Sequence, residues 1–325
     1  MSFFEVLEGD CRDLLPMLPS DHVQCVVTSP PYWGLRKYGE DPRELGSEKT
    51  FQEYLENMTA VFEEVRRVLR PDGTLWLNMG DSYSTGGNGG GEGLQRTNRG
   101  SLIGRRKRIE GIKHKDLIGQ PWALAFALRA AGWYLRQDII WAKPNPMPES
   151  VTDRPTRAHE YLFLMSKSKS YFYDAEAIAE PQMEYERRRR LLASKEATER
   201  KYEIKRNDSS HGQNAPGENG VARSAMARKR LAEKGKRNSR SVWQITNGHF
   251  AEAHYATFPP ALVLPCILAG SRPGDLVMDS FSGAGTVGKV CLERGRQYLG
   301  IELYAKNHEI TERRVAKTQP GLALA

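Results

Sequence analysis

The stretch DSFSGAGTVG, residues 279–288, joins a predicted buried strand at 275–281 to a predicted helix at 285–295. Its glycines match the pattern G-x-G-x-x-G at Gly283, Gly285 and Gly288. Glycines at this spacing allow a tight turn and a close approach of the backbone to a ligand. A strand, a glycine turn and a helix are the unit from which α/β proteins are built, so this stretch indicates the fold class.

The acidic residue after this turn and the place of the turn in the chain limit which ligands it could bind. Glu302 ends the next predicted strand, 297–303, and a carboxylate at that place can accept hydrogen bonds from ribose hydroxyls. Dehydrogenases usually open with such a unit, whereas here it lies within the last 50 of 325 residues. We therefore favour an adenosine cofactor other than a dinucleotide, bound by a rearranged α/β sheet. The alternative is a well-packed turn without a ligand.

Helix-like and strand-like segments alternate along the chain. Predicted helices occupy 51–69, 120–132, 259–270, 285–295 and 306–318, predicted strands occupy 74–78, 133–142, 160–168, 275–281 and 297–303, and RPDG (70–73) is a predicted turn. Apolar strands that alternate with helices are typical of a mostly parallel sheet covered on both faces by helices.

A second motif, VVTSPPYWGL at residues 26–35, ends another predicted buried strand. Its two prolines have no N–H to donate to a sheet ladder, so they stop the strand and stiffen the turn after it. Tyr32 and Trp33 therefore stand at the carboxyl end of the strand, next to the hydroxyl of Ser29. On composition alone, core aromatics and a serine that only bonds the strand end explain the motif equally well.

Basic residues are concentrated in two polar stretches. The chain has 48 Lys and Arg against 40 Asp and Glu, a net charge of +8. Residues 181–240 hold 17 basic against 8 acidic residues, and the glycine-rich residues 84–116 hold 8 against 3. Such stretches attract polyanions, of which nucleic acid is the commonest, although solvated surface charge is the plain alternative.

Cysteine spacing and apolar runs exclude several classes of protein. The cysteines show no C-x-x-C spacing, which argues against a disulfide framework or a zinc knuckle; they are Cys11, Cys25, Cys266 and Cys291. No apolar run reaches the roughly 20 residues of a membrane span. The first ten residues, MSFFEVLEGD, carry acids and no basic segment typical of a signal peptide. We expect a soluble protein of the reducing cytoplasm.

Together the two motifs resemble those of the amino-methyltransferases that methylate exocyclic amines of DNA bases with S-adenosylmethionine. TSPPY (28–32) is similar to the family's [D/N/S]-P-P-[Y/F] catalytic motif, and DSFSGAGT (279–286) to its cofactor loop. Segments 9–19, 154–168 and 254–268 are similar to flanking segments of the family. The catalytic motif comes first, as in the circularly permuted beta class. One departure is Ser280, where the family usually has proline.

The resemblance implies an α/β fold with a Rossmann-like, mostly parallel sheet and helices on both faces, circularly permuted and carrying an inserted recognition region. Residues 1–180 would form the catalytic half, with a flexible basic loop at 84–116. Residues 181–240 would be the target-recognition insert that binds DNA, and residues 241–325 the half that binds S-adenosylmethionine.

The resemblance also implies roles for individual residues. The catalytic residues would be Ser29, Pro30, Pro31 and Tyr32. The cofactor-binding residues would be Asp10, Thr28, Phe258, Asp279, Phe281, Gly283, Gly285, Thr286 and Glu302. The DNA-binding residues would be Trp33, Arg187, Arg188, Arg189, Arg228, Lys229 and Arg230. No metal ion is expected.

The chemistry of the reaction explains why such residues would follow a strand. An exocyclic amine is a poor nucleophile because its lone pair is delocalised into the base, so acceptors aimed at its N–H bonds favour the tetrahedral geometry of attack. The Ser29 hydroxyl and the Pro30 carbonyl are the expected acceptors, and Tyr32 would stack on a flipped base. Within the family a serine at this position goes mainly with cytosine N4, which we favour over adenine N6.

Other functions and the partners stay open at this point. Similar P-P-Y sites serve methylation of RNA and of protein amides, and a catalytically silent DNA-binding protein would keep the fold. Pro265 and Cys266 resemble the nucleophile dipeptide of the cytosine-C5 methyltransferases, but they lie in an apolar segment where an inert core cysteine is expected. The expected partners are double-stranded DNA and a cognate restriction endonuclease, with no membrane. The expected enzyme is a monomer or homodimer of bacterial, archaeal or phage origin.

Overall fold

The computed structural model describes residues 3–35, 39, 41–84, 111–182, 230–247 and 258–318. The chain forms two compact units, residues 1–173 with 241–325 and residues 174–240. Most of the two basic stretches lies outside the described residues, so the flexible loop and the DNA-binding insert stay predictions. None of the described helices combines the length and the apolar character needed to cross a membrane.

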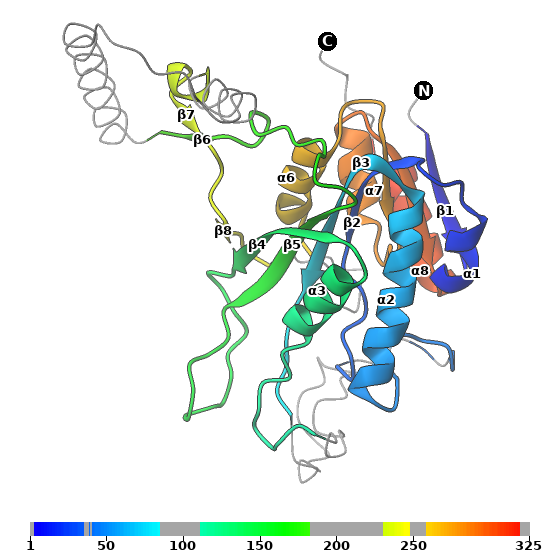
Figure 1. Ribbon diagram of the computed structural model, residues 1–325, viewed down its shortest axis with the longest axis vertical. Coiled ribbons are helices and arrows are strands. Elements are labelled where there is room, and N and C mark those ends of the chain that lie inside the picture. Colours follow the sequence, from blue (N-terminus) through cyan, green and yellow to red (C-terminus); the bar gives the residue numbers. More distant parts are fainter. Residues whose placement is uncertain are drawn as a thin grey trace, which may run out of the picture. The chain divides into compact units, whose positions relative to one another are not determined.

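The first unit is built on an eight-stranded sheet with the order β1-β10-β9-β2-β3-β5-β4-β8 (Figure 1). The strands are β1 Phe4–Glu8, β2 Val23–Thr28, β3 Leu69–Met79, β4 Tyr134–Ala142, β5 His159–Ser166, β8 Val242–Gln244, β9 Leu276–Asp279 and β10 Gln297–Glu302. Neighbouring strands are parallel except for β5, which is antiparallel to β3 and to β4. The predicted mostly parallel sheet is therefore confirmed.

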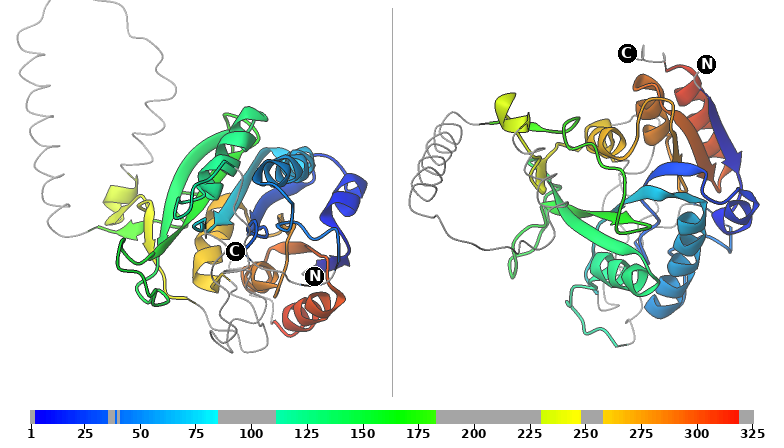
Figure 2. Two further views of the ribbon diagram at one scale, coloured as in Figure 1. Left: turned by 90° about the horizontal axis from the view of Figure 1, so that it is seen from below. Right: turned by 45° about the horizontal axis from the view of Figure 1, so that its top comes forward.

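Helices cover both faces of this sheet. They are α1 Cys11–Leu14, the short 3-10 helix η1 Leu15–Met17, α2 Phe51–Val68, α3 Gln120–Ala130, α6 Pro260–Gly270, α7 Thr286–Glu293 and α8 Ala305–Ala316. In Figure 2, α2 and α3 lie on one face of the sheet, while α6, α7 and α8 lie on the other. This arrangement confirms the predicted α/β fold.

The sequence of α2 explains both its start and its buried face. The Thr50 hydroxyl accepts from the backbone N–H of Glu53, and the Glu53 carboxylate accepts from the backbone N–H of Thr50, each at 3.1 Å. Tyr54, Met58 and Phe62 follow at helical spacing and have no exposed surface. They belong to the main hydrophobic core, so their burial holds α2 against the sheet beside the catalytic motif.

β3 differs from its predicted extent. The segment predicted to be a turn, 70–73, lies inside the strand, because the chain bulges there without reversing direction. The register with β2 shifts between Val23 and Cys25. Gln24 lies between them, and its Nε2 donates to the carbonyl of Asp72 at 3.4 Å. The bulge therefore leaves both strands in the same sheet.

The pairing of β2 with β9 brings the two sequence motifs together. Cys25 lies opposite Val277, and Val26 lies opposite Met278. β2 leads into the catalytic motif and β9 leads into the cofactor turn, and parallel strands end at the same edge of a sheet. Both motifs therefore lie side by side at that edge, although the catalytic motif precedes the cofactor motif in the chain, as the permuted fold requires.

The second unit contains a short antiparallel ladder between β6 Glu180–Pro181 and β7 Lys236–Arg237. The Glu180 carboxylate accepts from the backbone N–H of Arg240 at 2.9 Å and from the Arg237 guanidinium at 3.3 Å. Basic side chains of this unit are thus partly neutralised within it.

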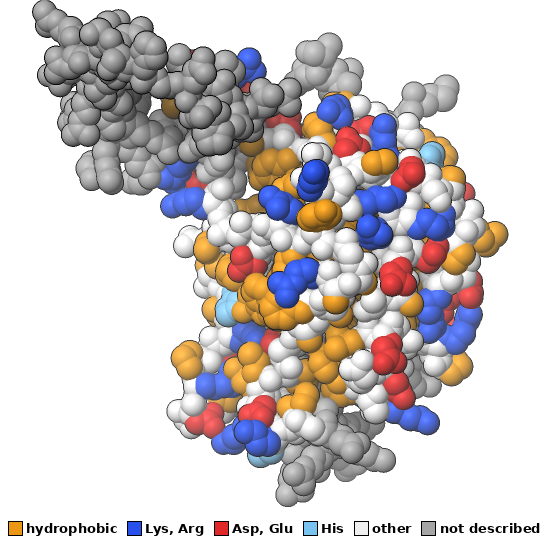
Figure 3. Space-filling model, in the orientation of Figure 1, with side chains coloured by type: hydrophobic (Ala, Val, Ile, Leu, Met, Phe, Trp, Pro, Cys, Tyr) orange, Lys and Arg blue, Asp and Glu red, His pale blue; other side chains and the backbone are white. Residues whose placement is uncertain are grey.

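Charged side chains of both signs share the face of the molecule shown in Figure 3. The excess of positive charge belongs to the stretches 84–116 and 181–240, of which the greater part is outside the described residues. Attraction of nucleic acid by these stretches therefore stays a prediction.

Candidate active site

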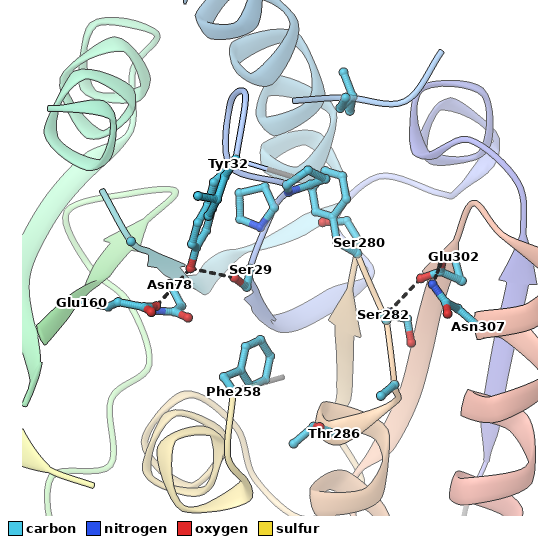
Figure 4. A pocket seen from close by; sticks show the side chains of 18 of the residues that line it. Ser29, Tyr32, Asn78, Glu160, Phe258, Ser280, Ser282, Thr286, Glu302 and Asn307 are labelled. Atoms are coloured by element: carbon cyan, nitrogen blue, oxygen red, sulfur yellow. Dashed lines mark hydrogen bonds between the residues drawn. The ribbon is translucent and has the colours of Figure 1, made fainter. Parts of the chain in front are cut away.

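A cavity of about 930 Å³ lies at the edge of the sheet where β2, β9 and β10 end (Figure 4). Residues 29–32 of the catalytic motif and 280–284 of the cofactor turn line it. In Figure 4, Tyr32 and Glu160 lie on one side of the cavity and Glu302 lies on the other. Open α/β sheets bind their ligands at this edge, so the cavity is the candidate site.

The catalytic motif forms a stiff turn along one side of the cavity. All four residues predicted to be catalytic line it: Ser29, Pro30, Pro31 and Tyr32. The Tyr54 hydroxyl of α2 donates to the carbonyl of Pro31 at 2.9 Å, and Ser29 Oγ lies 3.3 Å from the hydroxyl of Tyr32. The structure thus brings the four residues together at one wall, while their catalytic roles stay predictions.

Glu160 of β5 joins the catalytic motif to residues that sequence analysis missed. The Tyr32 hydroxyl donates to Glu160 Oε2 at 3.0 Å, and Asn78 Nδ2 donates to the same oxygen at 3.3 Å. Lys143 forms an ion pair with Glu160 Oε1, and its Nζ lies 4.2 Å from the centre of the Trp141 ring. Both Glu160 oxygens therefore have donors, and this network fixes the phenol of Tyr32.

The ionisation of Tyr32 is suppressed by its surroundings. Burial raises the pKa of Tyr32 well above its ordinary value, and the negative charge of Glu160 raises it further. The phenol therefore stays protonated and keeps donating to Glu160. A neutral ring held by its hydroxyl is suited to stacking against a base.

The Glu302 carboxylate closes the cofactor turn at the other end of the cavity. Its Oε2 accepts from the backbone N–H of Gly283 at 2.8 Å, and its Oε1 accepts from the N–H of Tyr304 at 3.1 Å and from Asn307 Nδ2 at 3.2 Å. Burial raises the pKa of Glu302, although these donors oppose the shift. Each carboxylate oxygen has more than one acceptor site, so Glu302 can still accept from ribose hydroxyls.

Gly285 shapes the cofactor turn without lining the cavity. It is the N-cap of α7 with a φ of 70°, in the left-handed region that glycine adopts without strain. A Cβ at this position would lie 2.8 Å from Cγ2 of Thr311 in α8. Gly285 therefore lets the turn pack against α8, and its predicted cofactor contact stays a prediction.

Thr28 and Asp279 also lie behind the cavity wall. The Thr28 hydroxyl donates to Asp279 Oδ1 at 2.6 Å, and the same oxygen accepts from the backbone N–H of Phe281 at 3.1 Å. Both residues are buried, and neither is among those that line the cavity. The pair ties β2 to the turn that follows β9, and the predicted cofactor contacts of Thr28 and Asp279 stay predictions.

Asp279 should make the stability of the first unit depend on pH. Burial raises its pKa to about 7, although hydrogen bonds from Thr28 and Phe281 oppose the shift. Between about pH 4 and 7 the folded protein keeps a proton that the unfolded chain has released, so the free energy of unfolding falls as pH rises. We expect Asp279→Asn to remove this slope of up to about 1.4 kcal/mol per pH unit, measured by urea denaturation at several pH values. Parallel pH profiles for the variant and the wild type would contradict this assignment.

Four other predicted cofactor residues line the cavity: Asp10, Phe258, Phe281 and Thr286. Burial raises the pKa of Asp10, but the hydrogen bonds and charge of Arg12 outweigh burial and leave the pKa below its ordinary value. Arg12 Nη2 lies 2.6 Å from Asp10 Oδ2, so this carboxylate is charged and already paired. Asp10 is therefore a hydrogen-bond acceptor at the cavity wall, and Arg12 already occupies some of its acceptor sites.

This end of the cavity fits S-adenosylmethionine. The rings of Phe258 and Phe281 and the Glu302 carboxylate offer apolar surface and acceptors for a nucleoside. Ser280 also lines the cavity, and its buried hydroxyl has no hydrogen-bond partner in the described part of the chain. A buried hydroxyl without a partner costs free energy, so a polar ligand group that reaches it would be favoured.

The predicted DNA-binding residues are in three different places. Trp33 is only 6% exposed, its ring centre lies 5.3 Å from that of Phe51, and its Nε1 donates to the carbonyl of Glu48 at 3.0 Å. The prediction that Trp33 faces DNA is therefore corrected, because its indole packs in the core beneath the turn. Arg230 is exposed in the second unit. The others lie outside the described residues: Arg187, Arg188, Arg189, Arg228 and Lys229.

Several polar residues that line the cavity were not predicted from the sequence, among them Asn78, Lys143 and Glu160. A usable signal was nevertheless present, because Asn78 interrupts the apolar strand β3 and Glu160 lies near the start of the apolar strand β5. A buried polar side chain in an otherwise apolar strand needs a hydrogen-bond partner. Such residues can therefore be predicted to lie near the polar residues of a site.

The chain is similar to known proteins over nearly its whole length. The family model described as DNA methylase, for the N6/N4 methyltransferases, matches residues 23–313. The Type II methyltransferase M.Cfr9I from Citrobacter freundii is 43% identical over 310 residues, which cover 95% of this chain and 87% of that protein.

Two solved structures of lower identity share the fold. A Thermus thermophilus protein assigned as a DNA modification methylase, complexed with S-adenosyl-L-methionine, has a TM-score of 0.58 at 22% identity and covers 98% of this chain and 96% of its own. PvuII DNA methyltransferase, described as cytosine-N4-specific, has a TM-score of 0.58 at 18% identity and covers 100% of this chain and 97% of its own. At these identities the likeness shows the α/β fold of the neighbours.

Proposed function

The chain belongs to the DNA methylase family, and we propose that it transfers a methyl group from S-adenosylmethionine to the exocyclic N4 of a cytosine flipped out of duplex DNA. The observation that carries this proposal is one cavity that both residues 29–32 and Glu302 line, with Tyr32 on one side and Glu302 on the other. A base and a nucleoside cofactor have to meet in one space for a methyl group to pass between them.

The cofactor would be held by Phe258, Phe281 and Glu302. Glu302 would accept from the ribose hydroxyls, and the glycine turn would let the backbone approach the ligand. S-adenosylmethionine supplies a methyl group that is already activated on a positively charged sulfonium. A fold neighbour complexed with this cofactor supports its choice over a dinucleotide.

The catalytic motif would prepare the amine for attack. The Ser29 hydroxyl and the Pro30 carbonyl would accept hydrogen bonds from its two N–H groups, which favours tetrahedral nitrogen and frees the lone pair. The nitrogen would form its bond to the methyl carbon as the bond from that carbon to sulfur breaks, S-adenosylhomocysteine would leave, and the nitrogen would lose one proton. The adjacent prolines hold these acceptors before the base arrives, so little reorganisation is needed during the reaction. Because the methyl group is already activated, alignment of this kind can supply most of the rate acceleration.

Tyr32, Lys143 and Glu160 would hold the flipped base. Removal of a base from the duplex stack costs a few kcal/mol, and stacking on the Tyr32 ring would return roughly 1–3 kcal/mol. Lys143 and Glu160 line the same part of the cavity and offer a donor and an acceptor to the polar edge of the base.

The serine at the first position of the catalytic motif supports cytosine N4. Members of the family that act on adenine N6 mainly have aspartate or asparagine at this position, whereas serine goes mainly with N4. Adenine N6 is the second candidate target, because it would use the same cofactor, the same fold and the same acceptors.

Restriction–modification is the proposed biological setting. The relative from Citrobacter freundii carries the name of a type II methyltransferase. In that setting duplex DNA is the substrate, the insert at 181–240 reads its sequence, and a cognate endonuclease is the partner. The proposal predicts that affinity for DNA falls steeply as salt rises, because basic residues contact phosphates.

Identification of the methylated product tests the proposed function. The protein is incubated with S-adenosylmethionine and unmethylated duplex DNA, and the DNA is digested to nucleosides for mass spectrometry. We expect N4-methylcytosine, in a sequence that mapping of the methylated sites then defines. N6-methyladenine would overturn the choice of base and keep the reaction. Methylation of RNA or protein alone, or no transfer at all, would overturn the function.

A further inference from the structure

Met147 is an exposed apolar side chain at the edge of the cavity. The connection between β4 and β5, residues 143–158, projects from the sheet (Figure 1). Met147 is 66% exposed, and it nevertheless lines the cavity. Pro146 and Pro148 flank it, and their fixed φ angles leave the backbone on either side little freedom.

The connection is fastened on both sides of Met147. The backbone N–H of Asn247 donates to Oδ1 of Asn145 at 3.3 Å. Arg154 Nη1 lies 2.6 Å from Glu149 Oε2, and the Arg154 guanidinium lies 3.9 Å from the centre of the Tyr83 ring. These contacts present the thioether at a defined place beside the cavity.

A high exposed fraction of a methionine side chain is not by itself evidence of a function. Met17 in η1 is 78% exposed, and it does not line the cavity. Met147 differs because it lines the cavity from the same connection as Lys143, which pairs with Glu160 beside Tyr32. Positive charge lies beside the same connection, where Lys115, with 70% of its side chain exposed, pairs with Asp153 at 2.6 Å. A lysine so exposed can contact a passing phosphate backbone.

We propose that Met147 enters the base stack of the DNA duplex and fills the gap left by the flipped base. This inference rests on the proposed function, which creates such a gap. Apolar side chains, methionine among them, serve as wedges between base steps, and the unbranched thioether adapts to an irregular space. Met147 thus favours the flipped state over the stacked state without touching the reacting atoms.

Methyl transfer to two duplexes tests this role. One duplex carries the sequence identified in the product assay, and the other is identical except for an abasic site opposite the target base, which leaves that base unpaired. The variants are Met147→Ala, Met147→Leu and the matched control Met17→Ala. We expect Met147→Ala to slow single-turnover transfer to the intact duplex by about tenfold or more and to act on the pre-opened duplex at the wild-type rate. Met147→Leu and Met17→Ala should match the wild type on both.

The outcomes separate this inference from the function on which it rests. Wild-type rates of Met147→Ala on the intact duplex would overturn it. Equal slowing on both duplexes would also overturn it, because damage to the connection would then explain the loss. If the wild-type enzyme transfers nothing to either duplex, the proposed function fails, and the wedge fails with it.

Discussion

Replacement of Ser29 by alanine is expected to lower kcat for methyl transfer by about 10²–10³, with the affinity for S-adenosylmethionine unchanged. The variant removes the side-chain acceptor that would polarise the amine, and that interaction strengthens as the nitrogen becomes tetrahedral. The hydrogen bond from Tyr32 to Glu160 does not involve Ser29, so the ring proposed to stack on the base stays in place.

Single-turnover rates and calorimetric titration with the cofactor measure this effect. Ser20→Ala is the matched control, because that hydroxyl lies in an exposed turn and accepts from Arg67 at 3.0 Å. A fall in kcat of less than about threefold would show that the Pro30 carbonyl suffices for alignment. Loss of cofactor affinity would show instead that Ser29 belongs to the other end of the cavity.

Glu302→Gln is expected to weaken binding of S-adenosylmethionine by about 10- to 100-fold. The variant keeps the size of the side chain, removes its charge and replaces one acceptor with an NH₂ donor. That donor would face the backbone N–H of either Gly283 or Tyr304, both of which donate to the carboxylate. The turn therefore loses an anchor, and the ribose loses a charge-assisted acceptor.

Calorimetry on the isolated protein measures this affinity without any DNA. Glu309→Gln on the exposed side of α8 removes the same charge from the surface and should leave the affinity unchanged. Thermal unfolding shows whether Glu302→Gln is folded. A folded Glu302→Gln variant with wild-type affinity would mean that Glu302 only anchors the turn and does not bind the ribose.

The sequence was sufficient to predict the layers of the fold and the two motifs that line one cavity. Strand and helix periodicity are local properties, and the glycine and proline motifs reveal turns directly. The hydrogen-bond partner of Tyr32, in contrast, could not be predicted from the sequence. Glu160 meets Tyr32 only because β5 runs antiparallel between β3 and β4, and no local pattern at Glu160 specifies that placement.

Trp33, Thr28 and Asp279 show why a place in or beside a motif does not by itself put a side chain on the wall of the cavity. Successive side chains of a strand or a tight turn point in different directions, so neighbours of a lining residue are often buried behind it. Trp33 turns into the core beside Phe51, while Thr28 and Asp279 bond each other. Thr28 and Asp279 are both buried because β2 pairs with β9 in the sheet. Spacing of residues along the sequence does not predict which strands pair.

The place of β1 at the edge of the sheet has a consequence for how the protein is made. Phe4–Glu8 pairs with β10 at Gln297–Glu302, so β1 gains this neighbour only after almost 300 residues have been synthesised. β2 likewise lacks one of its partners until β9 has left the ribosome. Contacts of such separation form late and slowly. A nascent chain that has not yet reached residue 302 therefore has a complete catalytic motif but no complete cofactor turn, and it cannot yet modify DNA.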